Sequence, residues 1–308
     1  MQRRYRIGTR GSKLALVQAN EVARRVAQAL GAPVEDVTEI VVISTAGDRI
    51  QDRSLSEIGG KGLFTEEIEQ QLGDGRIDLA VHSMKDMPTQ LPDGLLIDCL
   101  LEREDPRDAF ISLKASSLSQ LPQGAVLGTS SLRRGAQMKA LRPDLQIVPF
   151  RGNVETRLRK LADGVADATL LAMAGLSRME LLDRATSPLS DEDVLPAVAQ
   201  GAIGVERRAS DDEAAEMLSR LHHHETGLCV AAERAFLAVL DGSCRTPIAA
   251  LAKISGNTLR LRAMILTPDG AEVHETGREG GLSDAVALGQ DAGEELRRRA
   301  GPHFFDAR

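Results

Sequence analysis

The feature that most constrains the fold is an alternation of short apolar runs with amphipathic segments between residues 125 and 182. Short apolar runs bounded by turn residues predict strands, and longer segments with helical spacing of apolar residues predict helices. The predicted elements are strand Ala125–Thr129, helix Ser130–Leu141, strand Leu145–Phe150, helix Asn153–Ala162, strand Ala168–Leu171 and helix Gly175–Leu182. Alternation of this kind predicts a parallel sheet covered by helices.

The first hundred residues show the same kind of order. The predicted elements are strand Tyr5–Thr9, helix Lys13–Leu30, strand Val37–Ser44, helix Leu63–Leu72 and strand Ile77–Val81. Gly31 and Pro33 end the first helix. Gln18 lies on the apolar stripe of that helix and is either a satisfied boundary residue or a side chain that points into a site.

Two segments have the composition of linkers between domains. Glu102–Asp108 is dense in charge and contains a proline, and Asp193–Gly204 is rich in Gly, Pro and Ala. Beyond them we expect helices at 210–221 and 225–240, strands near 248–254, 258–266 and 271–275, and a last helix at 283–299. That helix has one stripe, formed by Leu282, Val286, Gly289, Gly293 and Leu296.

The sequence therefore predicts an α/β protein with two α/β lobes and a smaller C-terminal α+β domain. The expected boundaries are residues 1–101 plus 197–221 for the first lobe, 102–196 for the second and 222–308 for the C-terminal domain.

Composition excludes several classes of protein. Hydrophobic residues make up 42% of the 308 residues, which is typical of a globular chain. Aromatic residues are only 2% and the formal net charge is -7, so neither base stacking nor nonspecific DNA binding is expected. No run has the length of a membrane span, and no signal-peptide core follows the basic N-terminus. With three cysteines, an odd number, we expect a cytoplasmic protein without a disulfide framework.

The first candidate site residue is Asp86, in the segment His82–Pro88 that follows a predicted buried strand. Strand ends in α/β proteins commonly face the ligand. A carboxylate there can hold or transfer a proton, and the neighbouring Lys85 keeps it ionised. The alternative is an ordinary turn aspartate beside a solvated lysine.

The second candidate site is a concentration of arginines. Between Val126 and Lys160 there are eight basic residues and only two acidic ones. Ser130 and Ser131 lie where a strand meets a helix N-terminus, which favours an anion. Guanidinium groups suit carboxylates and phosphates, so several together indicate a polyanionic ligand. The candidates are Arg133, Arg134, Arg151 and Arg157, with Arg10 and Arg178 near other strand ends or helix starts. A solvated helix face is the alternative, and we expect it for Arg159 and Lys160.

Three further motifs bear on function. Cys244 lies in a Gly-Ser turn beside Arg245, which makes it either an accessible thiol of lowered pKa or an incidental surface cysteine. The segment 46–62, with Gly59-Gly60-Lys61-Gly62, lacks the Walker pattern and is expected to be a surface loop. The consecutive His222, His223 and His224 diverge around a helix axis and cannot share one ion, so no metal is expected.

Taken together, these segments resemble the hydroxymethylbilane synthase family, also called porphobilinogen deaminase. The resemblance runs almost end to end and is carried by Arg10–Leu16, Gly59–Phe64, His82–Pro88, Glu102–Phe110, Gly128–Arg134, Arg151–Leu158, Ala172–Leu176, Pro196–Gly204, His223–Glu225 and Gly242–Pro247. It implies two lobes with the fold of periplasmic binding proteins. It also implies an enzyme that joins four porphobilinogen molecules into linear hydroxymethylbilane and releases ammonia.

The resemblance also implies the roles of individual residues. The cofactor is a dipyrromethane attached through a thioether to Cys244, and the catalytic aspartate is Asp86. The cofactor contacts are Lys85, Ser130, Arg133 and Arg134, and the substrate contacts are Arg10, Ser12, Lys61, Arg151, Arg157 and Arg178. The family implies a monomer whose product passes to uroporphyrinogen-III synthase.

Two other functions stay open at the level of the residues alone. A non-enzymatic cytoplasmic sensor that binds a carboxylate or phosphate would need the arginines but neither Asp86 nor Cys244. A phosphate-handling P-loop enzyme is disfavoured by the missing Walker pattern.

Overall fold

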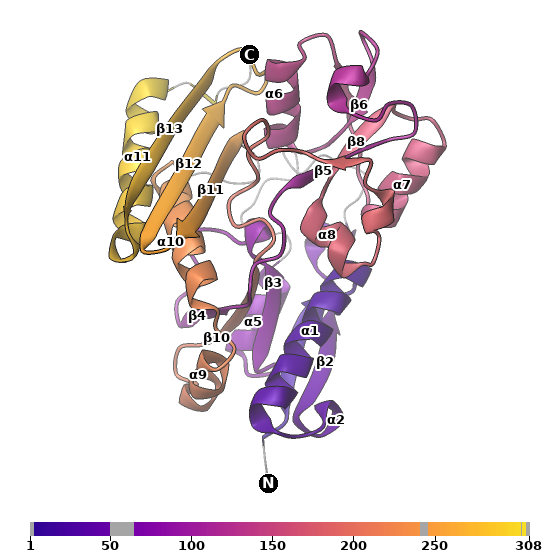
Figure 1. Cartoon of the computed structure of the whole chain (residues 1–308). Coiled ribbons are helices and arrows are strands. Elements are labelled where there is room, and N and C mark those ends of the chain that lie inside the picture. Colours follow the sequence, from indigo (N-terminus) through magenta and orange to yellow (C-terminus); the bar gives the residue numbers. More distant parts are fainter. Residues whose placement is uncertain (1–2, 50–64, 241–245, 303, 306–308) are drawn as a thin grey trace. The chain divides into compact units, whose positions relative to one another are not determined.

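The computed structural model describes residues 3–49, 65–240, 246–302 and 304–305 (Figure 1). Contacts divide the chain into two compact units, Met1–Arg103 with Ala202–Gly227, and Glu104–Gly201 with Leu228–Arg308. We call these unit 1 and unit 2. The expected three-domain division remains a prediction, since unit 2 contains both the predicted second lobe and most of the predicted C-terminal domain.

Unit 1 is built on a five-stranded sheet in the order β2-β1-β3-β10-β4. The strands are β1 (Tyr5–Arg10), β2 (Thr38–Ile43), β3 (Leu79–Ser83), β4 (Leu95–Leu100) and β10 (Ile203–Arg208). β1 runs parallel to β2 and β3, whereas β10 is antiparallel to both β3 and β4. The three strands predicted here, β1, β2 and β3, are parallel as expected, and the antiparallel pairs come from β10, which was not predicted. The composition of segment 193–204 predicts a linker, but its last residues begin the buried strand β10.

Helix α1 (Lys13–Leu30) begins and ends where the sequence predicts. The Ser12 hydroxyl accepts a hydrogen bond from the backbone N–H of Ala15, which caps the first turn. Gly31 ends the helix with a φ of 64°, a left-handed conformation that glycine adopts without strain. The apolar side of α1, with Val22 and Val26, packs on the sheet strands. The other helices of unit 1 are α2 (Val34–Val37), α3 (Ala46–Arg49), α5 (Glu66–Gly73), the 3-10 turn η1 (Met84–Asp86) and α9 (Asp212–Ser219).

One buried carboxylate joins several strands of unit 1. Asp78, 6% exposed, accepts hydrogen bonds from the Arg6 backbone N–H and side chain and from the Arg3 guanidinium, at 2.9 to 3.2 Å. Burial alone would raise the pKa of Asp78, but the bonds from Arg6 and Arg3 outweigh it and lower that pKa to about 2. Asp78 is therefore ionised at neutral pH and fixes the start of β3 to β1.

Unit 2 contains a second five-stranded sheet, in the order β7-β6-β8-β5-β9. The strands are β5 (Asp108–Ser112), β6 (Val126–Gly128), β7 (Gln146–Val148), β8 (Ala168–Ala172) and β9 (Ser187–Pro188). β6 is parallel to β7 and β8, as the alternation predicts, while β5 is antiparallel to β8 and β9. The helices are α6 (Leu132–Leu141), α7 (Val154–Ala162), α8 (Met173–Arg178) and the 3-10 turns η2 (Leu118–Gln120) and η3 (Leu182–Arg184).

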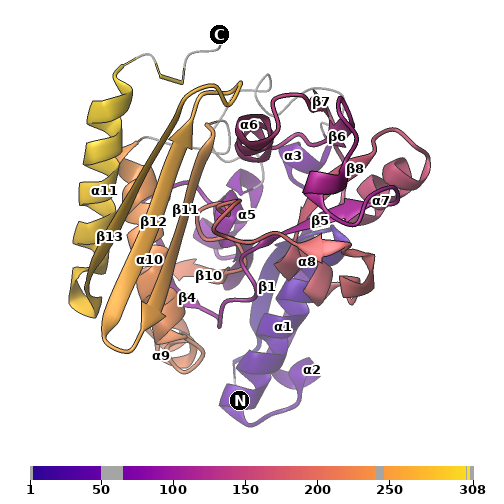
Figure 2. The same cartoon turned by 45° about the horizontal axis from the view of Figure 1, so that its top comes forward.

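The same unit ends in a three-stranded antiparallel sheet, β11 (Ile248–Ser255), β12 (Thr258–Leu266) and β13 (Val273–Gly281). After the 3-10 turn η4 (Leu282–Asp284), α11 (Ala285–Ala300) lies along β12 and β13 (Figure 2). Helix α10 (His224–Val239) begins in unit 1 and continues in unit 2. Gly289 lets α11 approach α10 closely, because a Cβ at this position would lie 2.1 Å from the Ala232 carbonyl oxygen. Val286 was expected on this stripe but is 48% exposed, so that expectation is wrong.

These sheets confirm the predicted fold class of two α/β sheets with a smaller antiparallel sheet and helices. Within unit 2, the buried Glu233 of α10 accepts the backbone N–H groups of Ala199 and Ala252 at 2.6 and 2.8 Å. One carboxylate thus joins the segment before β10 to β11. Among the described residues, no helix has the length and apolar character needed to cross a bilayer.

The three histidines lie at the start of α10. The ring of His222 accepts the Leu100 backbone N–H at 3.2 Å, and the His223 ring bonds the Thr226 hydroxyl at 2.9 Å. These bonds fit the expected role of the histidines in a helix connection.

Candidate active site

The end of β3 presents Asp86 to solvent. Residues Leu79 to His82 are buried, and the chain then turns through η1. The Met84 N–H donates to the Ala202 carbonyl and the Met87 N–H to the Met84 carbonyl, so the turn is fixed on both sides. Gly204 makes room for it, since a Cβ there would lie 2.2 Å from the Met84 sulfur. Asp86 is the exposed residue of this turn.

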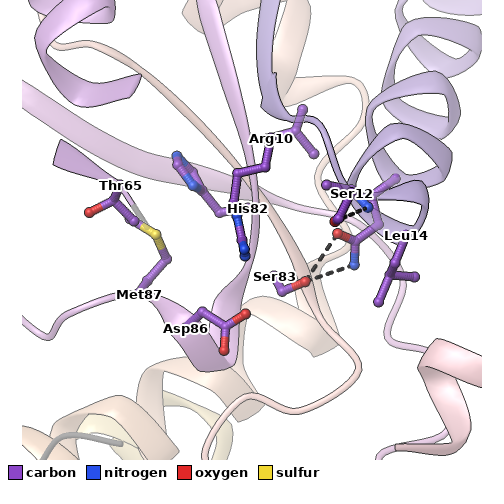
Figure 3. Close-up of a pocket in the computed structure, with 11 residues that line it drawn as sticks. Arg10, Ser12, Leu14, Thr65, His82, Ser83, Asp86 and Met87 are labelled. Carbon is purple, nitrogen blue, oxygen red and sulfur yellow. Dashed lines mark hydrogen bonds between the residues drawn. The ribbon is translucent and has the colours of Figure 1, made fainter. Parts of the chain in front are cut away.

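A small cavity of about 80 Å³ lies at this strand end (Figure 3). The ends of β1 and β3 are adjacent strand ends of one parallel pair, so residues from both line it. Its polar lining comprises Arg10, Ser12, Gln18, Thr65, His82, Ser83 and Asp86. The structure thus brings together three of the residues expected at the site, Arg10, Ser12 and Asp86. A cavity of this size has room for a few water-sized groups, which fits one arm of a ligand rather than a whole heterocycle.

Both possibilities that the sequence left open for Gln18 hold. Gln18 is 4% exposed, and its amide exchanges two hydrogen bonds with the Ser83 hydroxyl at 2.9 and 3.0 Å. Both residues line the cavity (Figure 3). Sequence reasoning did not select Ser83 as a site residue, although it lies between His82 and Asp86. Its position at the strand end was the available signal.

The two adjacent arginines of α6 lie inside unit 2. Arg133 and Arg134 are each 5% exposed and bind the two oxygens of Asp108 at 2.8 and 2.6 Å. Asp108 is 0% exposed and also accepts the Gln200 amide at 2.8 Å. Burial alone would raise the pKa of Asp108, but the charges of Arg133 and Arg134 outweigh it and hold that pKa far below its usual value. This arginine–aspartate centre therefore retains an excess of positive charge.

The other basic candidates of unit 2 lie near loops. Arg157 donates through Nε to the Gly152 carbonyl at 2.9 Å, and Arg178 donates to the Gly201 carbonyl at 2.9 Å. Arg151 is half-buried. The exposed Ser130 accepts the Phe150 N–H at 2.9 Å, and the Ser131 hydroxyl caps α6.

Of the solvated-face candidates, Arg159 is exposed, as expected, whereas the half-buried Lys160 donates to the Arg151 carbonyl. Lys85 is half-buried beside Asp86. Lys61, Cys244 and most of the expected loop 46–62 lie outside the described residues.

An acidic cofactor fits the basic groups of unit 2. Two buried guanidinium nitrogens, Arg134 Nε and Arg151 Nη1, have no hydrogen-bond partner among the described residues. A buried donor without a partner is costly, and an anionic group would satisfy it. The acetate and propionate arms of a dipyrromethane are anions of this kind.

Ligands of α/β proteins commonly bind at strand ends, and guanidinium groups bind carboxylates, so these features indicate an α/β protein that binds an acidic small molecule. Comparison with known proteins identifies the family. Residues 5–216 match the family model described as "Porphobilinogen deaminase, dipyromethane cofactor binding domain", and residues 227–298 match the model of the porphobilinogen deaminase C-terminal domain. The chain therefore belongs to the porphobilinogen deaminase family, whose members are transferases.

Relatives of known name agree over almost the whole chain. Porphobilinogen deaminase of Paracoccus denitrificans (strain Pd 1222) is 59% identical over 305 residues, which cover 99% of this chain and 97% of the relative. That of Nitrobacter hamburgensis (strain DSM 10229 / NCIMB 13809 / X14) is 55% identical over 97% of this chain and 94% of the relative. The chloroplastic enzyme of Oryza sativa subsp. japonica is 54% identical over 98% of this chain and 86% of the relative. The expectations of this family, of an enzyme and of dipyrromethane as cofactor are confirmed.

Solved structures with some likeness include a periplasmic substrate-binding protein of an ABC transporter from Coxiella burnetii, with a TM-score of 0.43 and 15% identity over 75% of this chain and 96% of that one. A methionine-bound nutrient-binding protein from Burkholderia cenocepacia has a TM-score of 0.44 and 16% identity over 70% and 89%.

Proposed function

We propose that the cavity at the end of β3 is the catalytic centre of a hydroxymethylbilane synthase and that Asp86 is its catalytic carboxylate. The reaction joins four porphobilinogen molecules head to tail, releases four ammonia molecules and yields linear hydroxymethylbilane in tetrapyrrole biosynthesis. The observation that carries the assignment is the exposed position of Asp86 on a turn fixed by the Met84 and Met87 backbone bonds. A rigidly placed acid can act without first reorganising.

Asp86 has two tasks in this reaction. Loss of ammonia from porphobilinogen leaves an electron-poor carbon attached to the pyrrole, and a nearby carboxylate stabilises the positive charge spread over that ring. The same carboxylate can accept hydrogen bonds from pyrrole N–H groups, which orients the ring for the next bond. Arg10 and Ser12, which line the cavity with Asp86, would bind a carboxylate arm of the substrate.

The basic residues of unit 2 hold the acidic chain. We assign Ser130, Arg133 and Arg134 to the cofactor together with Lys85, and Arg151, Arg157 and Arg178 to the substrate together with Lys61. The unpartnered nitrogens Arg134 Nε and Arg151 Nη1 support this assignment, because each can donate to an anion without breaking an internal bond. Cys244 would hold the dipyrromethane, which when bound would supply the first pyrroles of the chain and keep the intermediates bound.

Replacement of Asp86 by alanine tests the catalytic assignment. We expect folding and cofactor attachment to persist. The activation free energy should rise by at least ~3 kcal/mol, which lowers turnover about 100-fold or more. Turnover of porphobilinogen, the intact mass and far-UV circular dichroism would be measured. Asp93→Ala is the matched control, since Asp93 is another exposed aspartate of unit 1. Near-normal turnover of Asp86→Ala would remove Asp86 from the mechanism.

Mass spectrometry tests the attachment. The intact protein should exceed its sequence mass by one dipyrrole, and peptide mapping should locate the addition on the peptide that contains Cys244. A fully active protein without the added mass, or with the mass on Cys99 or Cys229, would contradict the assignment.

The expected setting of the enzyme is also part of the proposal. The acidic balance of -7 and the odd number of cysteines support a cytoplasmic protein. We propose a monomer that passes its product to uroporphyrinogen-III synthase. Sedimentation velocity should give a single species near 33.1 kDa, and a dimer would contradict the monomer.

A further inference from the structure

Behind the cavity lies a buried group of three titratable side chains that the proposed mechanism does not yet use. His82, 6% exposed, meets Glu206, 0% exposed, with 2.9 Å between His82 Nε2 and Glu206 Oε2. His82 lies opposite Gly204 in the antiparallel pair β3–β10, and Glu206 is two residues further along β10. Side chains at such diagonal positions share one face of the sheet and are within reach when they are long. Glu69 of α5, 8% exposed, covers the same region.

Within this His82 cluster, Glu69 is the carboxyl group that favours its protonated form. Glu206 Oε1 and Glu69 Oε1 are buried and have no hydrogen-bond partner among the described residues. Burial, and then the charge of Glu206, raise the pKa of Glu69. Two negative charges side by side in this buried region would be unfavourable, which is why Glu69 favours its neutral form beside Glu206. Among residues 3–49 and 65–240, the charged groups near the cluster include Glu66 on α5 and, at the cavity, Asp86 and Arg10.

A bound metal ion does not explain the cluster. Within the described part of the chain, no three or more His, Cys, Asp and Glu side chains are arranged to hold one. His82 itself reaches the cavity and lines it together with Asp86 (Figure 3). Because Glu206 occupies Nε2, Nδ1 is the ring nitrogen that can exchange a proton with the cavity.

The chemistry of chain growth requires a proton acceptor. The C–N bond of the aminomethyl group breaks in its protonated, ammonium form, and the electron pair leaves with nitrogen as ammonia. A C–C bond then forms with an electron pair from the free α-carbon of another pyrrole, and that carbon loses its hydrogen as a proton to restore the aromatic ring. The released proton needs a base at the reaction site before it passes to solvent or ammonia.

We propose that His82 accepts this α-carbon proton and that Glu206 is a buried positioning residue that orients the ring of His82 and stabilises its protonated form. The inference rests on the proposed function of the cavity. It assigns the two proton tasks to different groups, with Asp86 stabilising the cationic ring and His82 receiving the proton. Glu69, from the helix α5 that packs on β3 and β10, favours its neutral form and so keeps the cluster from carrying two negative charges.

The variant Glu206→Gln tests the proposal, since glutamine keeps the shape of the side chain and removes its charge. We expect kcat to fall about 10- to 100-fold with KM within about twofold of the wild type. The acidic limb of the kcat–pH profile should move to lower pH, because the imidazolium form of His82 loses its ionic partner. With porphobilinogen deuterated at the free α-carbon, the isotope effect on kcat should increase in the variant. If Glu206 had only a structural role, its replacement would change neither the kcat–pH profile nor the isotope effect.

Two controls keep the test decisive. Glu206→Gln should keep the fold, since the glutamine amide oxygen can still accept a hydrogen bond from the His82 ring, and far-UV circular dichroism checks this. Should that variant not fold, His82→Ala assayed with added imidazole replaces it, and recovery of turnover by imidazole is the expected result. The proposal is overturned by an unchanged pH profile together with an unchanged isotope effect in Glu206→Gln, or by absence of imidazole rescue. Those outcomes are independent of the Asp86→Ala result, so the two assignments can fail separately.

Discussion

Removal of the charge of Asp108 should destabilise unit 2 selectively. Asp108 binds Arg133 and Arg134 in an interior where all three residues are at most 5% exposed. In Asp108→Asn the two guanidinium groups remain buried without a counterion, and the new amide N–H group faces a cation. Breaking a buried ion pair from one side costs about 3–5 kcal/mol, so we expect a loss of that size in the free energy of unfolding of unit 2.

The pH dependence gives this prediction a sign. The pKa of Asp108 is depressed in the folded protein, so its ionised form stabilises the fold above the unfolded pKa of about 3.9. That stabilisation decreases as the pH falls below about 4. The difference in stability between wild type and Asp108→Asn should therefore be constant from about pH 5 upward and should shrink in acid.

Urea unfolding measures the loss in the free energy of unfolding. Hydrogen exchange detected by mass spectrometry then assigns this loss to particular peptides. Peptides from β5, β6 and α6 should exchange faster, while those from α1 and β1 should not change. Asp105→Asn is the matched control, because Asp105 pairs with Arg107 in a partly exposed position and should cost much less. A loss below about 1 kcal/mol in Asp108→Asn, or equal losses in both units, would refute the reasoning.

Three further predictions concern single residues. Asp78→Asn should lower the stability of unit 1 by about 2 kcal/mol at pH 7, and this difference should disappear between about pH 4 and pH 2, because the folded pKa of Asp78 is lowered to about 2. Urea unfolding at pH 7 and pH 3 measures the difference in stability. An equal difference at the two pH values would contradict the prediction. Gly289→Ala should lower the melting temperature, with a loss of about 1–3 kcal/mol in the free energy of unfolding, because the new Cβ meets the Ala232 carbonyl. At an unobstructed helix position the same change would stabilise the helix. A higher melting temperature would show that α11 moves away freely. Cys99 is 0% exposed and burial raises its pKa to about 12. The thiol should therefore resist alkylation in the native protein and react in urea. Mass spectrometry measures the labelling, and rapid labelling of the native protein would argue against a buried thiol.

Local signals in the sequence predicted much of the fold. The helix Lys13–Leu30 was predicted with its observed bounds, because Ser12 and Gly31 provide a cap and a stop that depend only on neighbouring residues. The strand β10 was not predicted. Its first residues belong to a segment rich in Gly and Ala, and its partners β3 and β4 lie about a hundred residues earlier in the chain. Pairing between strands so far apart in the sequence produces no recognisable pattern in the residues around β10.

The candidate site was predicted in part for similar reasons. Asp86 and Arg10 lie at strand ends or helix starts that local patterns reveal, Ser12 was expected from the family resemblance, and the structure brings all three to one cavity. The burial of Arg133 and Arg134 was not foreseen, because Asp108 appeared to belong to a charged linker when it in fact begins the buried strand β5. Which charges pair inside a protein depends on tertiary contacts rather than on composition.

The position of β10 has a consequence for biosynthesis of the chain. This strand lies between β3 and β4, yet it is encoded after the whole of the second five-stranded sheet. A nascent chain that has emerged from the ribosome only as far as residue 201 lacks the strand that joins β3 to β4, so β4 has no partner in the sheet of unit 1. Completion of that N-terminal sheet must therefore wait until about two thirds of the polypeptide has been translated, although domains generally fold in the order of their synthesis.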